Sequence, residues 1–186
     1  MNGNIIMYNL LIFILLLTFP VTNQSTIGKV NLKAPIEELS AYLFLSETCP
    51  ICISLTPEIK KIEAEFLNKG LVLHLVFPNV KDSNPEKIGK FVRKYHLKSQ
   101  AFIDNEQSLT NKYGASTTPE VFLVEKKTDR IIYSGKVNDE FIALGKRKRT
   151  NINHFLYDAI RKYLEGDKST VISTKAVGCF IIKEID

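Results

Sequence analysis

The sequence predicts an α/β protein, a three-layer α/β/α sandwich with a central mixed sheet. Short, continuous apolar runs of the kind that form buried strands alternate with segments whose apolar residues recur at helical spacing. In chain order these segments read β-α-β-α-β-α-β-β-α, which places helices on both faces of one sheet. The 186 residues, 45% hydrophobic and 24% charged, are enough for one domain with a proper core.

The individual elements follow from this spacing and from turn residues. The predicted strands are residues 41–45, 71–77, 101–103, 121–124 and 131–133, and the last two are expected to form a hairpin. The predicted helices are residues 52–68, 85–95, 106–113 and 152–164. Glycines close three of these helices, at Gly70, Gly114 and Gly166.

The first 24 residues carry no charged side chain, so the formal charge of +5 belongs to the rest of the chain. Their apolar segment is Ile5 to Phe19, and its uninterrupted core, Leu10 to Phe19, is shorter than the run of about 20 apolar residues that spans a bilayer. We therefore expect a signal peptide over residues 1–24, with a retained N-terminal membrane anchor as the alternative. Either way the folded domain, residues 25–166, and a C-terminal extension, residues 167–186, are expected to be exported.

The motif Cys49-Pro50-Ile51-Cys52 stands between the first predicted strand and the first predicted helix. Two thiols separated by two residues can close a ring reversibly, and a helix N-terminus stabilises a thiolate on the first cysteine. A zinc half-site is the alternative, but the three histidines and Cys179 offer no second close-spaced pair of ligands. We therefore expect redox chemistry with no metal and with no cofactor beyond a Cys49–Cys52 disulfide.

Further motifs add a family resemblance to this argument. Cys49-x-x-Cys52, Pro57 and Thr118-Pro119 ahead of a strand resemble the thioredoxin fold over roughly residues 30–166. In that family the helical proline bends the active-site helix, and a cis threonine–proline bond presents backbone to the substrate. More narrowly, four motifs in order resemble a bacterial redoxin-domain family, namely Cys49-Pro50, the TPEVFL run at 118–123, the GKVND run at 135–139 and the GCFI run at 178–181.

The resemblance implies an exported thiol–disulfide oxidoreductase in the periplasm or cell envelope of a bacterium. Cys49, expected to be the more exposed thiol, would attack, and Cys52 would resolve the mixed disulfide. Thr118 and Pro119 would line the substrate groove, and the two residues between the cysteines, Pro50 and Ile51, would influence the reduction potential. The implied partners are protein thiols or disulfides and an upstream membrane or envelope electron donor, with no nucleic acid.

The chain departs from thioredoxins at two positions. Thr48 stands where they have tryptophan, and Leu43 stands where they have a buried aspartate that moves protons. Glu47 and Glu120 are the nearby candidates for that proton transfer. The alternative for each is a solvated surface carboxylate.

The third cysteine, Cys179, leaves an odd thiol beyond the pair. It lies in Ala176–Ile181, a segment that could fold back as an edge strand. It is expected to be a buried small hydrophobe, or else a third redox thiol near the pair or an anchor for a partner. The basic run Lys146–Arg149 is expected to be a solvated loop, with docking of an acidic partner as the alternative, and His74 is expected to be a core residue.

Two other functions stay open at this stage. A peroxiredoxin-like peroxidase would use Cys49 to attack peroxide, and Ser46 supplies a hydroxyl three residues earlier. However, Tyr42 replaces the upstream proline of peroxiredoxins, and no arginine follows closely to hold the peroxide. The other alternative is a binding module that has kept the fold and uses the groove beside Pro119 for partners.

Overall fold

The structure is a computed structural model that describes residues 38–168 and 172–183. The expected signal peptide, or anchor, over residues 1–24 lies outside these described residues. Among the described residues, no helix has the length and apolarity that a membrane crossing requires.

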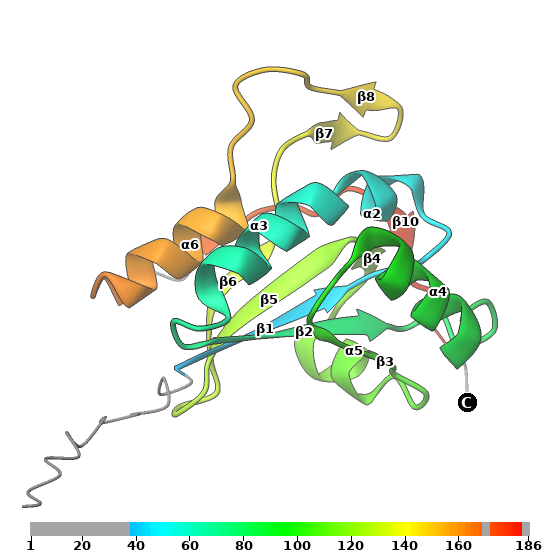
Figure 1. Cartoon of the computed structure of the whole chain (residues 1–186), viewed down its shortest axis with the longest axis horizontal. Helices are drawn as coiled ribbons and strands as arrows, with labels where there is room; N and C mark the ends of the chain where they lie inside the picture. Colours follow the sequence, from blue (N-terminus) through cyan, green and yellow to red (C-terminus); the bar gives the residue numbers. More distant parts are fainter. Residues whose placement is uncertain (1–37, 169–171, 184–186) are drawn as a thin grey trace, which may run out of the picture. The chain divides into compact units, whose positions relative to one another are not determined.

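A six-stranded mixed sheet forms the centre of the described domain, in the strand order β3-β2-β1-β5-β6-β9 (Figure 1). β1 pairs in parallel with β2 and antiparallel with β5, so the middle of the sheet is where the strand direction changes. β2 pairs with β3 in parallel, β5 with β6 antiparallel, and β6 with β9 in parallel. The bounds are β1 Leu39–Phe44, β2 Leu71–Phe77, β3 Gln100–Ile103, β5 Glu120–Glu125, β6 Arg130–Gly135 and β9 Ile172–Ser173.

Helices cover both faces of this sheet, which confirms the predicted three-layer sandwich (Figure 1). Side chains alternate along β1, so that Leu39, Ala41 and Leu43 enter one core cluster and Phe44 enters the other. The larger cluster also holds side chains of four helices and the smaller one holds those of a fifth. The four are α2 Pro50–Ser54, α3 Thr56–Phe66, α4 Pro85–Tyr95 and α6 Phe155–Leu164, and the fifth is α5 Ser108–Tyr113.

The helix predicted over residues 52–68 consists of two helices, α2 and α3, separated at Leu55. Pro57 explains the break, because proline lacks the N–H that would bond the carbonyl of Ile53 four residues earlier. The Thr56 hydroxyl donates to that carbonyl instead, at 2.9 Å. The sequence therefore places Pro57 correctly as a bend but misses that the bend divides the helix.

Two other helices begin later than predicted because the residue before each lies outside the right-handed helical region. Gln107, with φ of 49°, cannot continue a right-handed helix, so α5 begins at Ser108 instead of Glu106. α6 begins at Phe155 instead of Ile152, because its N-cap residue His154, with φ of −101° and ψ of 67°, lies outside the helical region.

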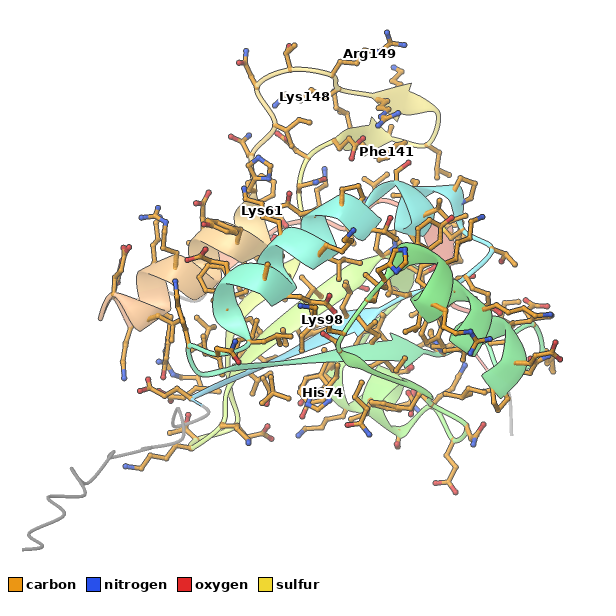
Figure 2. All side chains as sticks on the ribbon, viewed as in Figure 1. Lys61, His74, Lys98, Phe141, Lys148 and Arg149 are labelled. Carbon is orange, nitrogen blue, oxygen red and sulfur yellow. The ribbon has the colours of Figure 1, made fainter. Side chains whose placement is uncertain are left out.

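The basic run Lys146–Arg149 was predicted as a loop, but half of it is a strand. β8, Lys146–Arg147, pairs antiparallel with β7, Phe141–Ala143, across a turn at Gly145. Arg147 forms an ion pair with Glu140, and the Lys148 ammonium lies 2.8 Å from Asp139. Figure 2 shows Phe141, Lys148 and Arg149 on this hairpin and the segment that leaves it, away from His74 in the sheet. His74 stacks on Tyr42 with ring centroids 4.8 Å apart and is half-buried, so the expected core position is met only in part.

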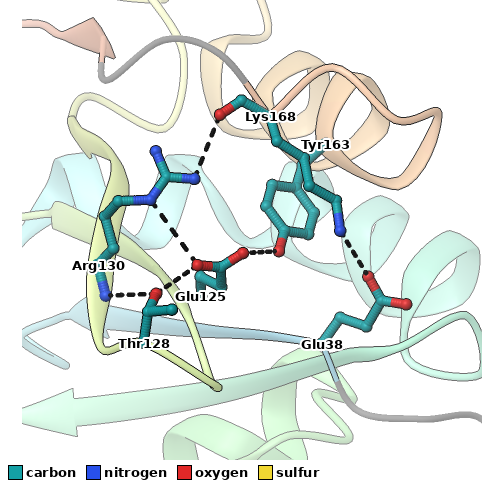
Figure 3. Close-up of polar contacts among 6 residues, drawn as sticks. All are labelled: Glu38, Glu125, Thr128, Arg130, Tyr163 and Lys168. Atoms are coloured by element: carbon teal, nitrogen blue, oxygen red, sulfur yellow. Dashed lines mark hydrogen bonds and ion pairs between the residues drawn. The ribbon is translucent and has the colours of Figure 1, made fainter.

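A polar network joins α6 to the tip of the β5–β6 hairpin (Figure 3). The Glu125 carboxylate accepts a hydrogen bond from the Tyr163 hydroxyl at 2.5 Å and another from the Thr128 hydroxyl. Arg130 lies 3.7 Å from the same carboxylate and donates to the carbonyl of Lys168 at 3.2 Å. The Thr128 and Tyr163 hydrogen bonds lower the pKa of Glu125, so this carboxylate is ionised at neutral pH.

We predict that Tyr163→Phe lowers the free energy of unfolding, because Glu125 loses one charge-assisted hydrogen bond. Urea denaturation monitored by circular dichroism measures this change. Tyr157→Phe is the matched control, since Tyr157 lies on the same helix but outside the Glu125 network. Equal stability of the two variants would contradict the assigned role of Tyr163.

Candidate redox site

The loop after β1 places Cys49 at the carboxyl end of a central strand. The Leu45 N–H still donates to Val76 O at 2.8 Å, and the chain then leaves the sheet. Cys49 N–H donates to Ser46 O at 3.2 Å, which forms a turn, and Cys49 becomes the N-cap residue of α2. Pro50 occupies the first helical turn, where a missing N–H costs nothing. The sequence therefore builds a strand–turn–helix unit that holds the first sulfur at the helix start.

Three cysteine sulfurs meet at this point. Cys52, one turn into the helix segment, is fully buried, and its sulfur accepts the Ser46 N–H at 3.4 Å. The Cys179 sulfur, from the far end of the chain, lies 3.0 Å from the Cys49 sulfur. In its protonated form the Cys49 thiol donates to the Thr118 carbonyl, 3.4 Å away. The candidate site thus contains both thiols of the motif and the third cysteine.

The environment lowers the pKa of Cys49 to about 5, from an ordinary value of about 8.5. The largest cause is the hydrogen bond from the Cys52 thiol, and burial acts against it. The Cys179 thiol and the amides of Cys52 and Ile51 contribute further donors. At neutral pH Cys49 is therefore a thiolate, which is the nucleophilic form.

The other two thiols keep their protons at neutral pH. Burial raises the pKa of Cys52 well above the usual range, and the hydrogen bond and negative charge of Cys49 add to it. Cys179 is exposed as a residue, but the partial desolvation of its sulfur beside Cys49 raises its pKa to about 11, and the hydrogen bond and negative charge of Cys49 add to it. One negative charge is thus shared among three sulfurs and is centred on Cys49.

Thr118 and Pro119 lie beside Cys49, and the bond between them is cis, as the resemblance implies. Thr118 belongs to β4, Thr117–Thr118, which pairs antiparallel with β10, Cys179–Phe180. Pro119 lines a small hollow with Ile51 and Val177. The backbone that was predicted to receive a substrate is thus occupied by the chain's own C-terminal segment.

Both accessory carboxylates are engaged in hydrogen bonds that hold loops. Glu120 Oε2 accepts the N–H groups of Ser116 and Thr117 at 2.8 and 3.2 Å, which fixes the approach to β4. Glu47 Oε2 accepts the Ser83 hydroxyl at 2.7 Å. None of these contacts involves a sulfur, so proton transfer by either carboxylate stays a prediction.

Two expectations about exposure are wrong. Cys49 is only 2% exposed, because β10 lies against it, whereas the sequence favoured a more accessible thiol. Cys179 was weighed as a buried small hydrophobe, yet it is the exposed cysteine of the three. Within Ala176–Ile181, Cys179 and Phe180 do fold back as the short strand β10, which confirms that part of the prediction.

Sequence reasoning gave Gly178 no role of its own. A Cβ atom at Gly178 would lie 2.0 Å from Thr118 O and 2.9 Å from Pro119 Cδ, so only glycine permits the observed approach. The available signal was the Gly178-Cys179 pair itself, a glycine directly before the odd cysteine.

Leu43, at the position of the thioredoxin aspartate, is fully buried, and its side chain carries no proton-transferring group. The described residues contain no cluster of three or more metal-ligating side chains arranged for a metal ion.

The fold and this site define the class: a thioredoxin-like protein with a Cys-x-x-Cys motif after a central strand. The sequence profile of the redoxin family matches residues 22–146, about two thirds of the chain. The chain therefore belongs to the redoxin family. Among curated protein sequences none matches the chain.

Solved structures agree on the fold. A hypothetical protein of Sinorhizobium meliloti 1021 is similar with a TM-score of 0.65 and 21% identity, over 78% of this chain and 79% of that one. An uncharacterized conserved protein of Geobacillus kaustophilus is similar with a TM-score of 0.64 and 20% identity, over 82% of this chain and 81% of that one. The thioredoxin domain of a thiol-disulfide oxidoreductase from Bacteroides vulgatus is similar with a TM-score of 0.50 and 17% identity, over 69% of this chain and 80% of that one.

The pKa assignment makes a direct prediction for the reduced protein. The ultraviolet absorbance of one thiolate should persist from neutral pH down to about pH 5 and be lost below it, because the pKa of Cys49 is lowered. In Cys52→Ala the midpoint should move upward toward the ordinary cysteine value of about 8.5, since the largest stabilising donor is removed. Cys49→Ser is the control and should lack the transition near pH 5. An unchanged midpoint in Cys52→Ala would contradict the assignment.

Proposed function

We propose that this redoxin is an exported thiol–disulfide oxidoreductase that works through Cys49 and Cys52. The observation that carries the proposal is the position of Cys49 at the start of α2, with its sulfur against the Thr118 carbonyl and the Cys179 sulfur. The hydrogen bond from the Cys52 thiol lowers the pKa of Cys49 to about 5. A thiolate that is already ionised at neutral pH, with a second thiol in contact, is what thiol–disulfide exchange requires. The cis-proline backbone beside the sulfur and the membership in the redoxin family agree with it.

The first step follows from the charge on Cys49. Its thiolate attacks one sulfur of a substrate disulfide, the substrate's S–S bond breaks, and the released substrate thiolate takes up a proton. A mixed disulfide now joins Cys49 to the substrate. Thr118 supplies backbone at which an extended substrate segment would pair, as β10 does in the structure.

The second step uses Cys52. While Cys49 is a thiolate, its negative charge is one of the factors that keep Cys52 protonated. That factor disappears once Cys49 is bonded to the substrate, so Cys52 loses its proton more readily and attacks the Cys49 sulfur. The Cys49–Cys52 disulfide forms, and the substrate leaves as a dithiol after taking up the second proton. The reverse sequence oxidises a substrate dithiol.

The proposed setting is the bacterial periplasm or cell envelope. It rests on the uncharged leader with its apolar segment Ile5–Phe19, ahead of the folded domain. An envelope electron donor would re-reduce the Cys49–Cys52 disulfide, and protein thiols or disulfides would be the substrates. Leu43 stands where thioredoxins have a proton-transferring aspartate, so Glu47 or Glu120 would transfer the proton in this protein.

We predict that Cys49→Ser abolishes insulin reduction by the protein when dithiothreitol recycles it, because the variant lacks the sulfur that is a thiolate at neutral pH. The turbidity of precipitating insulin B chain measures the activity. His96→Ala is the control for general handling, since that residue lies at the end of α4 and outside the sulfur site. Activity retained in Cys49→Ser would overturn the proposal.

A peroxide-consumption assay on the same proteins separates exchange from peroxidase chemistry. The groups that lower the pKa of Cys49 are two thiols and two helix amides, and none of them is an arginine that could hold a peroxide. We therefore expect insulin reduction without comparable peroxide consumption. Peroxide consumption that exceeds insulin reduction would favour the peroxidase instead.

A further inference from the structure

The C-terminal segment lies in the position that an external substrate strand would need. Cys179 pairs with Thr118 and Phe180 with Thr117 in antiparallel register, directly before the cis Thr118–Pro119 bond. The Thr118 hydroxyl also donates to Cys179 O at 3.4 Å. Because Thr118 is the backbone predicted to receive substrate, this pairing fills the groove from within.

The same pairing aims a thiol at the reactive sulfur. The Cys179 and Cys49 sulfur atoms are 3.0 Å apart, so a bond between them would require an approach of about 1 Å. Gly178 makes this approach possible, since any side chain there would collide with Thr118 O and Pro119. Gly178 therefore allows the close backbone contact with Thr118, and that contact places the Cys179 thiol beside Cys49.

Anchors on both sides hold this segment in place. Upstream, the Thr174 N–H donates to Ser134 O at 2.9 Å, and Thr174 Oγ1 accepts the Lys136 N–H at 2.9 Å. Downstream, Ile181 is buried in the smaller core cluster, and its N–H donates to Ser116 O at 3.0 Å. The carbonyl of Ile182 accepts from Gln107 Nε2 at 2.7 Å. Cys179 is thus held at a fixed position between two attachment points.

We propose that residues 176–182 act as an internal substrate strand, with Cys179 exchanging with Cys49 to form an intramolecular disulfide that caps the site. This inference rests on the proposed function of the Cys49–Cys52 pair and adds a third redox thiol to it. It also explains why Cys49, at 2% exposure, is closed to external protein disulfides until the strand leaves.

The exchange needs no additional oxidant. The Cys179 thiol loses its proton and its sulfur attacks the Cys49 sulfur of an existing Cys49–Cys52 disulfide. The Cys49–Cys179 bond forms as the Cys49–Cys52 bond breaks, and Cys52 leaves with the electron pair and takes up a proton. One disulfide and one thiol are present before and after, so the oxidation state of the protein is unchanged.

The exchange has a consequence for partners. Cys179 is the exposed cysteine of the three, while Cys49 and Cys52 are buried. In the capped state an external thiol therefore meets the Cys179 sulfur first, and the electrons it delivers reach the buried pair through Cys179. The tail thus serves both as a cover for Cys49 and as the solvent-facing contact of the three-sulfur unit.

Disulfide mapping of the full chain tests the proposal. After equilibration with a glutathione redox buffer and acid quenching, peptides analysed without reduction should include the Cys49–Cys179 linkage in wild type, and it should be the dominant linkage in Cys52→Ala. Cys179→Ser should show only Cys49–Cys52. Absence of Cys49–Cys179 from both the wild type and Cys52→Ala would overturn the proposal while leaving the Cys49–Cys52 function intact. Loss of insulin reduction is a separate readout for that function.

A second variant tests the covering role. Gly178→Ala should displace β10 from β4, so that iodoacetamide alkylates Cys49 of the reduced protein faster than in wild type. In the glutathione redox buffer the same variant should form less Cys49–Cys179 disulfide than wild type. Gly89→Ala is the matched control, because its added Cβ would meet the far end of the Arg93 side chain in helix α4 and not backbone. Equal alkylation rates in wild type and Gly178→Ala would contradict the covering role, and circular dichroism verifies that each variant is folded.

Discussion

The hydrogen bond between the Cys52 thiol and the Cys49 sulfur is the interaction on which the rest of the site depends. It places a negative charge on a sulfur that is almost completely buried, and burial alone would have opposed that charge. Burial and, after it, the same interaction raise the pKa of Cys52, so that the two thiols of one motif have opposite protonation states. A division of labour between an attacking and a resolving thiol follows from this pairing.

The fold supplies the geometry for that interaction. β1 lies at the centre of the sheet, between a parallel and an antiparallel neighbour, and its carboxyl end feeds directly into the turn before α2. The Ser46 N–H that would otherwise lack a strand partner bonds the Cys52 sulfur. On the other side, Glu120 holds the N–H groups before β4, which sets the Thr118 carbonyl against Cys49. Strand ends from two parts of the chain thus define one sulfur site.

Much of this could be predicted from the sequence, because the determinants are local. The alternation of apolar runs with helical segments predicted the α/β/α sandwich, and sequence motifs identified Cys49, Cys52 and the Thr118-Pro119 pair.

The placement of Cys179 could not be derived this way, since it depends on a pairing with Thr118 across 61 residues. The β7–β8 hairpin was also missed, because its second strand is Lys146–Arg147, which carries no apolar alternation. The division at Leu55 was missed because Pro57 was expected to bend one continuous helix, whereas it separates α2 from α3.

The central claim is that Cys49 is the nucleophile of the site. The most direct measurement is the reaction of the reduced Cys52→Ala/Cys179→Ser double variant with oxidised glutathione, followed by peptide mass spectrometry. With both thiols that could resolve the product removed, the account predicts one glutathione held in a stable mixed disulfide on Cys49. A Cys49 that stays unmodified in the folded double variant under these conditions would contradict the account.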